Sequence, residues 1–110
     1  MDFNDFLKID MRVGKIIEIE DFERSRTPSY KVKVDFGSEL GIKTSSMQAK
    51  NAYLKEELLN MEVIGVVNLP EKNIAGYISQ VLILGVSKND GTLSLLTPSK
   101  NPSLLGSKVH

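Results

Sequence analysis

Apolar and polar residues alternate most regularly in the segment 30–36, where every second side chain is apolar and the others are lysine or aspartate. A period of two is typical of a β-strand with one face in the core and the other in solvent. The segment therefore predicts a half-buried strand. The side chains expected to point inward are Tyr30, Val32, Val34 and Phe36.

Apolar runs separated by turn residues predict further strands. They cover residues 11–21, 42–47, 63–69, 78–86 and 92–96. Gly14 is the expected bend in the first of them, because a glycine inside a strand often marks a bend. Turns are expected at residues 37–41 and at 88–91, where an Asp-Gly pair tolerates positive φ angles. The tail from Pro98 predicts ordered coil or disorder.

Two short helices complete the pattern. At the N-terminus, apolar side chains at i, i+3 and i+4 form one stripe, and Asp2 can cap the helix that carries them. Asn51 can cap a second helix over residues 52–59, with Leu54 and Leu58 on its inner face. Three strands, a helix and two or three more strands follow the order of a five-stranded OB-fold Greek-key barrel, an all-β fold. Periodicity alone leaves other small barrels open.

The composition indicates one cysteine-free domain, residues 1–110. No apolar stretch approaches the ~20 residues of a membrane span, and the acidic N-terminus lacks the basic and apolar regions of a signal peptide. These features predict a cytoplasmic location. The 14 basic residues are balanced by 14 acidic residues, so strong non-specific RNA binding is not the default expectation.

Several kinds of catalytic chemistry lack the residues that they need. The only histidine is His110 at the end of the chain, so catalysis or metal binding by histidine is not expected. There is no glycine-rich phosphate loop. Glu18 and Glu20 share one face of a strand, and Lys43 lies near two serines. We interpret the glutamate pair as a solvated strand face and the lysine with its serines as non-catalytic. We expect no enzymatic activity, no metal and no cofactor.

The candidate binding residues fall into three groups. Lys31 and Lys33 point off the outer face of the alternating strand, where solubility is the simpler explanation for them. Arg24 and Arg26 lie in the loop after the first strand, which flanks the ligand groove in OB-folds. The alternative for these arginines is a mobile charged loop. The third group is the loop 68–80, which strands hold at both ends and which presents its side chains to a partner.

This loop and the run after it, NLPEKNIAGYISQVLIL at residues 68–84, resemble the NL-x-P-R-K-x-x-G-x-x-S-E/Q-G-M segment of the tRNA-binding OB domains. Those domains occur at the C-terminus of methionyl-tRNA synthetases, in free-standing tRNA-binding proteins and in CsaA-type secretion chaperones. Other pieces are similar in the same order: DMRVGKI at 10–16, IKTSSMQ at 42–48, LLTP at 95–98 and LGSKV at 105–109. The CsaA branch is the most similar, since it shares the short length with nothing appended, DFG at 35–37 and IAG at 74–76.

The resemblance also indicates which residues bind. Lys72 keeps one cation of the family's loop, whereas Asn73 and Ala75 stand where the family has two more. Each lost cation is expected to weaken RNA binding and to flatten its salt dependence. Further on, Val81 and Leu82 replace a glycine and a methionine. The residues expected to bind nucleic acid or peptide are Asn68, Lys72, Asn73, Ile74, Tyr77, Ser79, Gln80, Lys43, Arg24 and Arg26.

By resemblance, the chain is a CsaA-type binding module and not an enzyme. It is expected to bind tRNA, unfolded polypeptide or both in the groove of its barrel, as a chaperone related to protein export. Tyr77 and Ile74 would offer a platform for a base or an apolar side chain. Two alternatives remain: a chaperone that binds polypeptide without RNA, favoured by the zero net charge, and a free-standing cofactor that brings tRNA to a synthetase.

Both ends of the chain carry surplus apolar side chains, as a self-complementary interface requires. CsaA-type proteins, by resemblance, use the N-terminal segment and the C-terminal tail in a two-fold dimer. We therefore expect a homodimer with residues 1–9 and 97–110 at its interface. The alternative is that the N-terminal helix plugs the open end of its own barrel. The expected interface residues are Phe3, Phe6, Leu7, Leu104, Leu105 and Val109.

Overall fold

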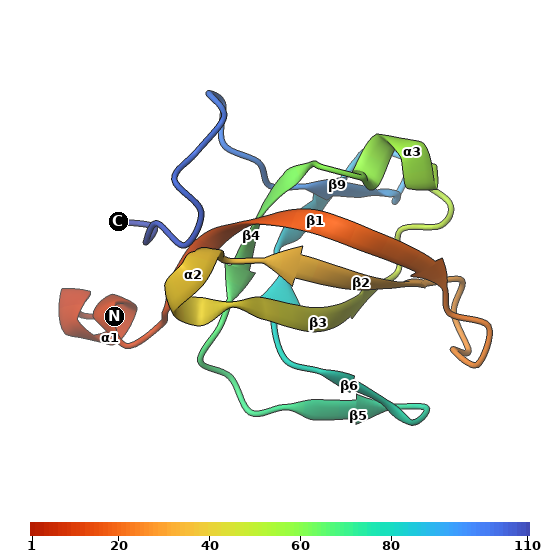
Figure 1. Cartoon of the computed structure of the whole chain (residues 1–110), viewed down its shortest axis with the longest axis horizontal. Coiled ribbons are helices and arrows are strands. Elements are labelled where there is room, and N and C mark those ends of the chain that lie inside the picture. The colour runs from red at the N-terminus through yellow and green to blue at the C-terminus, as the bar shows by residue number, and fades with distance from the viewer.

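The computed structural model describes residues 1–110 and is built around one five-stranded sheet (Figure 1). Neighbouring strands are antiparallel, and their order is β3-β2-β1-β4-β7. β1 is central because it pairs with β2 along one edge and with β4 along the other. The strands are β1 (Met11–Asp21), β2 (Tyr30–Asp35), β3 (Ile42–Met47), β4 (Glu62–Val66) and β7 (Leu82–Ile83).

The outer strands of the sheet approach each other and nearly close a barrel. The backbone N–H of Gln80 donates to the carbonyl of Thr44 in β3 at 2.8 Å. The Ser45 hydroxyl donates to the carbonyl of Val81 at 2.7 Å. These bonds join β3 to the residues just before β7. The prediction of a five-stranded OB-like barrel, with a helix between its third and fourth strands, is confirmed.

The inner face of β2 fills this barrel, and the four side chains predicted to point inward are all buried. Phe36 is 1% exposed and occupies space that two glycines leave free. A Cβ atom at Gly14 would lie 2.8 Å from the Phe36 ring, and one at Gly65 would lie 3.0 Å from it. Gly14 therefore admits this ring rather than bending the strand. The irregularity in β1 lies further on, between Ile16 and Glu18.

The N-terminal helix forms as predicted, and a second helical turn replaces a predicted simple turn. α1 (Phe3–Leu7) is capped by Asp2, whose carboxylate accepts the backbone N–H of Asn4 at 2.7 Å. No residue of α1 is buried, so the helix does not plug the end of its own barrel. The expected turn at 37–41 contains a short helix, α2 (Gly37–Leu40).

The helix predicted over residues 52–59 is wrong in length, because α3 spans only Lys55–Leu58. The predicted cap, Asn51, lies in a separate turn before the helix. Leu58 is fully buried, whereas Leu54 is 65% exposed. Leu54 is the N-cap residue and has an extended backbone, so it does not share the helical face that directs Leu58 into the core.

The C-terminal half is more broken than its apolar pattern predicts. β4 ends at Val66, before the end of the strand predicted at 63–69. The strand predicted at 78–86 is divided among β6 (Tyr77–Ser79), β7 and β8 (Gly85–Ser87). Inside the predicted loop, β5 (Lys72–Ile74) pairs with β6 as a hairpin. β9 (Leu93–Leu95) pairs with β8 around the turn that the Asp-Gly pair predicts.

The tail from Pro98 is ordered against the start of β1 and β4. The backbone N–H of Gly106 donates to the Val13 carbonyl at 2.8 Å. Ser103 donates its N–H and its hydroxyl to the Glu62 carboxylate at 2.8 and 2.6 Å. β2 pairs with β1 only from Lys15 onward. The tail thus covers the first residues of β1 on the edge that β2 does not reach. None of the helices has the length and apolar character needed to cross a membrane.

Candidate functional site

The β5–β6 hairpin stands away from the five-stranded sheet, below β3 in the view of Figure 1. Cross-strand pairing sets Lys72 opposite Ser79 and Ile74 opposite Tyr77, so these four side chains share one face of the hairpin. That face is turned toward the sheet, because the Tyr77 hydroxyl donates to the carbonyl of Val32 at 3.2 Å. Hollows form where the hairpin and the sheet do not touch.

The hairpin turns at Ala75 and Gly76, whose φ angles are 50° and 87°. Two successive positive φ angles are typical of a type I′ turn. Asn73 closes this turn, because its side-chain oxygen accepts the backbone N–H of Gly76 at 2.8 Å. Asn73 also lies opposite Ile78, on the face of the hairpin turned away from the sheet. The structure therefore gives Asn73 a part in the turn and does not place it in a hollow.

The first hollow, of about 200 Å³, lies between the hairpin and β3 and is called here the hairpin hollow. It brings together four of the predicted binding residues with apolar neighbours. Lys72 is exposed and takes part in no ion pair, so its ammonium is available to an anion. The lining residues are Ser45, Ser46, Leu69, Pro70, Lys72, Ile74, Ser79, Gln80, Val81 and Leu82.

Gln80 supports this hollow through bonds within the chain. Its side-chain oxygen accepts the N–H and the hydroxyl of Thr44 at 3.0 and 3.2 Å. Its amide NH₂ donates to the Glu71 carboxylate at 3.1 Å. Because both ends of the amide are occupied, Gln80 holds the loop in place and fixes Glu71 beside Lys72.

The second hollow, of about 330 Å³, lies where the β1–β2 loop meets the hairpin turn and is called here the loop hollow. Arg24 reaches the turn, since its Nη1 lies 3.7 Å from where a Cβ of Gly76 would stand. The Tyr77 ring meets Phe22 edge to face, with 5.6 Å between centroids. The Lys31 ammonium lies 5.4 Å from the centroid of Tyr77. Asp21 and Glu23 line the same hollow, so its two cations are matched by two acids. The aromatic pair suits a base, and Arg24 is the cation left without an ion pair to meet a phosphate.

The Tyr77 hydroxyl stays protonated at neutral pH. Burial raises the pKa of this hydroxyl, and the negative charges of Glu20 and Glu18 raise it further, while Thr44 acts in the opposite direction. The hydroxyl therefore keeps donating to the β2 backbone. This bond holds the hairpin on the sheet.

The cations of this face divide into a paired and an unpaired group. The Lys31 ammonium lies 3.4 Å from Glu20, and that of Lys33 lies 3.3 Å from Glu18. Both pairs join residues that face each other in the β1–β2 register. The predicted binding cations are in no ion pair. They are Arg24, Arg26, Lys43 and Lys72.

Besides Asn73, three predicted binding residues lie outside both hollows. Asn68 braces the N-terminal segment, because its side-chain oxygen accepts the N–H of Asp10 at 3.0 Å and its NH₂ donates to the carbonyl of Lys8 at 2.7 Å. Arg26 is exposed in the β1–β2 loop. Lys43 is half-buried in β3. The structure thus leaves Lys72, Ile74, Ser79, Gln80, Arg24 and Tyr77 as predicted residues that line a hollow.

The sequence reasoning found Ile74 and Tyr77 but missed the other apolar residues that line the two hollows. Phe22 is buried beside Tyr77, directly after β1. Leu69 and Leu82 are 47% and 52% exposed at the two ends of the hairpin segment. Their position in the sequence, as large apolar residues next to a polar loop, could have indicated that they line the site. Lys31, which solubility seemed to explain, also belongs to the loop hollow.

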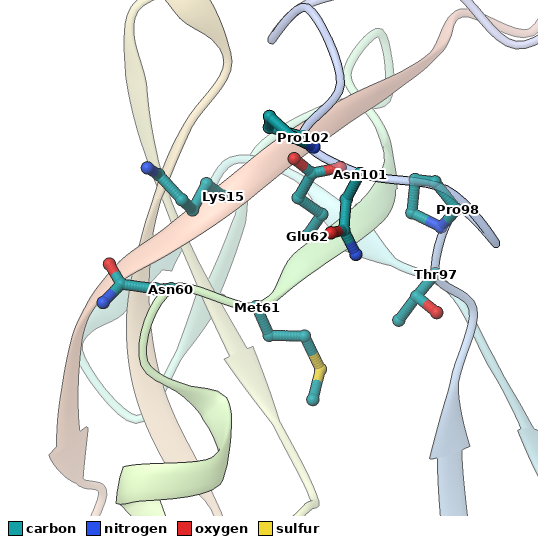
Figure 2. A pocket seen from close by; sticks show the side chains of 8 residues that line it. All are labelled: Lys15, Asn60, Met61, Glu62, Thr97, Pro98, Asn101 and Pro102. Carbon is teal, nitrogen blue, oxygen red and sulfur yellow. The ribbon is translucent and has the colours of Figure 1, made fainter.

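A further hollow, of about 380 Å³, lies beneath the C-terminal tail, on the side of the barrel away from the hairpin (Figure 2). Figure 2 shows Lys15, Asn60 and Asn101 around it, with the Glu62 carboxylate beside Pro102. That carboxylate is already bound by Ser103. No predicted binding residue lines this hollow. No group of three His, Cys, Asp or Glu side chains in the chain could hold a metal ion.

The first loop and the hairpin of this OB-like barrel frame two hollows, and both contain cations and an apolar or aromatic lining. These features define a ligand-binding barrel domain. The family described as "Putative tRNA binding domain" matches residues 11–105, and the chain belongs to this family. The match covers the barrel, the hairpin and most of the tail.

Solved structures and curated proteins agree with this membership. The CsaA chaperone protein from Picrophilus torridus is 47% identical with a TM-score of 0.92, and the match covers 100% of this chain and 99% of that one. The chaperone CsaA from Bacillus anthracis is 38% identical with a TM-score of 0.91, covering 100% and 98%. The methionine–tRNA ligase of Pyrococcus horikoshii is 43% identical over 108 residues, which are 98% of this chain but 14% of the ligase. The chain thus spans about one seventh of the length of this curated relative.

Proposed function

We propose that this chain is a non-enzymatic module that binds tRNA on the face formed by the β5–β6 hairpin and the β1–β2 loop. Membership of the tRNA-binding domain family is the observation that carries the proposal. The free cations at the two hollows support it, because phosphate contacts supply most of the affinity of such domains. The cations that line the hollows without an ion pair are Arg24 and Lys72.

In this proposal the two hollows divide the recognition of a nucleotide. Arg24 and Lys72 meet phosphate oxygens. Tyr77, held against Phe22, offers its ring to one base. The hairpin hollow, with Leu69 and other apolar side chains, takes an unstacked base. Stacking of this kind tolerates different bases, so affinity is expected to depend more on salt than on sequence.

Fluorescence anisotropy with labelled bulk tRNA at several salt concentrations tests this proposal. Lys72→Ala and Arg24→Ala should each weaken binding and lower the slope of log K against log salt by about one unit, as expected for one lost phosphate contact. Lys100→Ala is the matched control, since Lys100 is an exposed, unpaired cation in the tail, away from this face. If neither Lys72→Ala nor Arg24→Ala changes the slope, tRNA does not bind at this face.

We also propose that the chain forms a homodimer through α1 and the C-terminal tail. Figure 1 places the two termini at the same end of the molecule. Phe3 is 71% exposed, Leu7 50% and Leu104 83%, so this end carries large apolar side chains that water covers in the single chain. Phe6, Leu105 and Val109 are half-buried there. A second copy would bury the exposed set, consistent with a self-complementary interface.

Polypeptide binding is a second candidate function. Full-length similarity to two structures named as chaperones favours it. In that case the chain would act in the cytoplasm and would deliver unfolded polypeptide to export machinery. A third role, bringing tRNA to a synthetase, is favoured by the similarity to the ligases, of which this chain covers a small part.

A further inference from the structure

The barrel does not close along the full length of β3 and β7. It is bridged at Thr44 and Val81 by the bonds described above. Beyond these bonds the strands separate around a hollow of about 490 Å³, called here the seam. Ser46 of β3 lines it from one side and Ile83 of β7 from the other.

The backbone of Ser46 points into the seam. Phe36 N–H donates to the carbonyl of Gly41 at 3.0 Å, at the end where β2 and β3 meet. In an antiparallel pair, bonded and non-bonded residue pairs alternate. The pair of Phe36 with Gly41 is bonded, so every second pair from it is bonded and the pairs between are not. The pairs Lys33–Thr44 and Lys31–Ser46 are therefore non-bonded. The N–H and C=O of Ser46 are therefore directed away from β2, like the Thr44 carbonyl that accepts Gln80.

The backbone of Ile83 points into the seam from the opposite side. Leu84 N–H donates to the carbonyl of Ile64 at 2.9 Å, so that residue pair is bonded. The adjacent pair of Gly65 with Ile83 is then non-bonded by the same alternation. Ile83 therefore directs its N–H and C=O away from β4.

Two strand edges thus face each other across the seam without a bond between them. No backbone–backbone hydrogen bond outside the regular strand pairs involves Ser46 or Ile83, and the Ser46 carbonyl accepts only a long bond of 3.4 Å from the Ser45 hydroxyl. β3 and β7 run in the same direction, because each step in the order β3-β2-β1-β4-β7 reverses direction. A chain inserted between them, antiparallel to both, can bond to both edges once these move apart to leave about 5 Å on each side of it.

The lining of the seam carries no charged side chain. Its polar groups are hydroxyls and amides, among them those of Gln48, Asn51 and Ser87, and its apolar surface includes Met47 and Leu93. A groove without a cation has nothing to meet a phosphate, whereas unpaired N–H and C=O groups match a peptide backbone. The chemistry of the seam thus favours polypeptide over RNA.

We propose that the seam binds an extended, uncharged segment of polypeptide, which adds a strand between β3 and β7. The proposal rests on the second candidate function, polypeptide binding, and gives it a site that meets the tRNA face only at Ser46, which lines the hairpin hollow as well. Backbone bonds supply the attraction and tolerate many sequences. The uncharged lining disfavours segments with charged side chains.

Fluorescence anisotropy with a labelled peptide of alternating threonine and valine, blocked at both ends, tests this site. Ser87→Trp places an indole in the seam from an exposed position on β8, and it should weaken binding by at least about tenfold, the equivalent of one lost hydrogen bond. Val86→Trp is the control, because Val86 is 54% exposed on the same strand and does not line the seam. It should bind as the wild type does.

A fully N-methylated version of the peptide tests the backbone bonds on the unaltered protein, and it should not bind. Binding should change little with salt and persist in excess bulk tRNA. Equal binding of the methylated peptide, or displacement by tRNA, would overturn the seam proposal. Full binding by Ser87→Trp would also overturn it while leaving polypeptide binding elsewhere intact. If no variant and no wild-type protein binds the peptide, the second candidate function fails as well.

Discussion

Three amide side chains that the sequence singles out as ligand contacts bind the chain itself. Asn68 holds the N-terminal segment, Asn73 closes the hairpin turn and Gln80 joins the loop to β3. The sequence shows that these amides are present but not which neighbours they bond, because a side-chain amide in a loop can hydrogen-bond nearby backbone groups as well as a ligand. The cations Lys72 and Arg24 were better candidates, since long charged side chains more often reach solvent.

Ala75 is a residue whose backbone conformation its side chain does not favour. Its φ of 50° lies in the left-handed region, where Asn and Gly are more stable than Ala. Ala75→Asn should raise the free energy of unfolding by roughly 0.5 kcal/mol, measured by urea denaturation. Ala75→Val should lower it, because a β-branched residue is more strained there. A lower stability for the Asn variant would contradict the type I′ assignment.

At the scale of elements, the first three strands were predictable and the later ones were not. β1, β2 and β3 have the predicted bounds to within one residue, because each has a long apolar or alternating pattern and lies between clear turn residues. The β5–β6 hairpin has short, largely polar strands, held in place by bonds from Tyr77 and Thr44 to distant backbone. Periodicity does not record such tertiary bonds.

The same limit applies to α3 and to the candidate site. The helix shortens to one turn because Ala52 and Tyr53 both donate to the carbonyl of Ala49 in a turn of their own. The hairpin segment was predictable as the binding region. Its division into two hollows was not, because that depends on how Phe22 and Leu69 pack against β2 and β3.

The β1–β2 ladder carries acidic residues that compete with phosphate for two lysines. Glu18 and Glu20 pair with Lys33 and Lys31, beside Tyr77. Replacing both acids by glutamine should strengthen tRNA binding and steepen its salt slope by up to about two units, since two more cations become available. Anisotropy titrations would measure this. Glu56→Gln, which also removes an acid but lies on α3, should change affinity much less; equal gains would indicate a general charge effect.

The end of β1 is joined to α3 by a charged cluster that predicts a pH dependence. Asp21 lies 2.9 Å from Lys55 and 3.2 Å from Lys50, and these hydrogen bonds lower the pKa of its carboxyl. A lowered pKa in the folded state stabilises the fold above the ordinary aspartate pKa of about 3.9. That contribution is lost as the pH falls below this value.

The difference in thermal midpoint between wild type and Asp21→Asn should therefore shrink as the pH is lowered from neutral to about 3. Glu23→Gln is the control, because Glu23 is a neighbouring acid without an ion pair. A difference that stays constant with pH would show that Asp21 acts through packing alone.

At the scale of the whole molecule, the two terminal segments carry several exposed apolar side chains, among them Phe3, Leu7 and Leu104. Leu7→Glu and Leu104→Glu should each convert a dimer to a monomer, because a carboxylate in an apolar interface is strongly disfavoured. Deleting residues 1–9 should give a monomer or an aggregate. Light scattering measures these masses.

The control for the dimer is Leu54→Glu. Leu54 is 65% exposed next to α3, at a distance from α1 in Figure 1. This variant should keep the mass of the wild type. A wild-type chain that scatters as a monomer at tens of micromolar would exclude the dimer.

The central position of β1 has a consequence for the time course of folding. β1, β2 and β3 form a meander whose paired strands are close in sequence. The other edge of β1 pairs with β4, and Met11, for example, pairs with the distant Val66. During synthesis, one edge of β1 therefore stays unpaired until β4 leaves the ribosome, and the core face of the meander stays wet. The first half of the nascent chain is thus the species most prone to association, and its exposure ends when β4 docks.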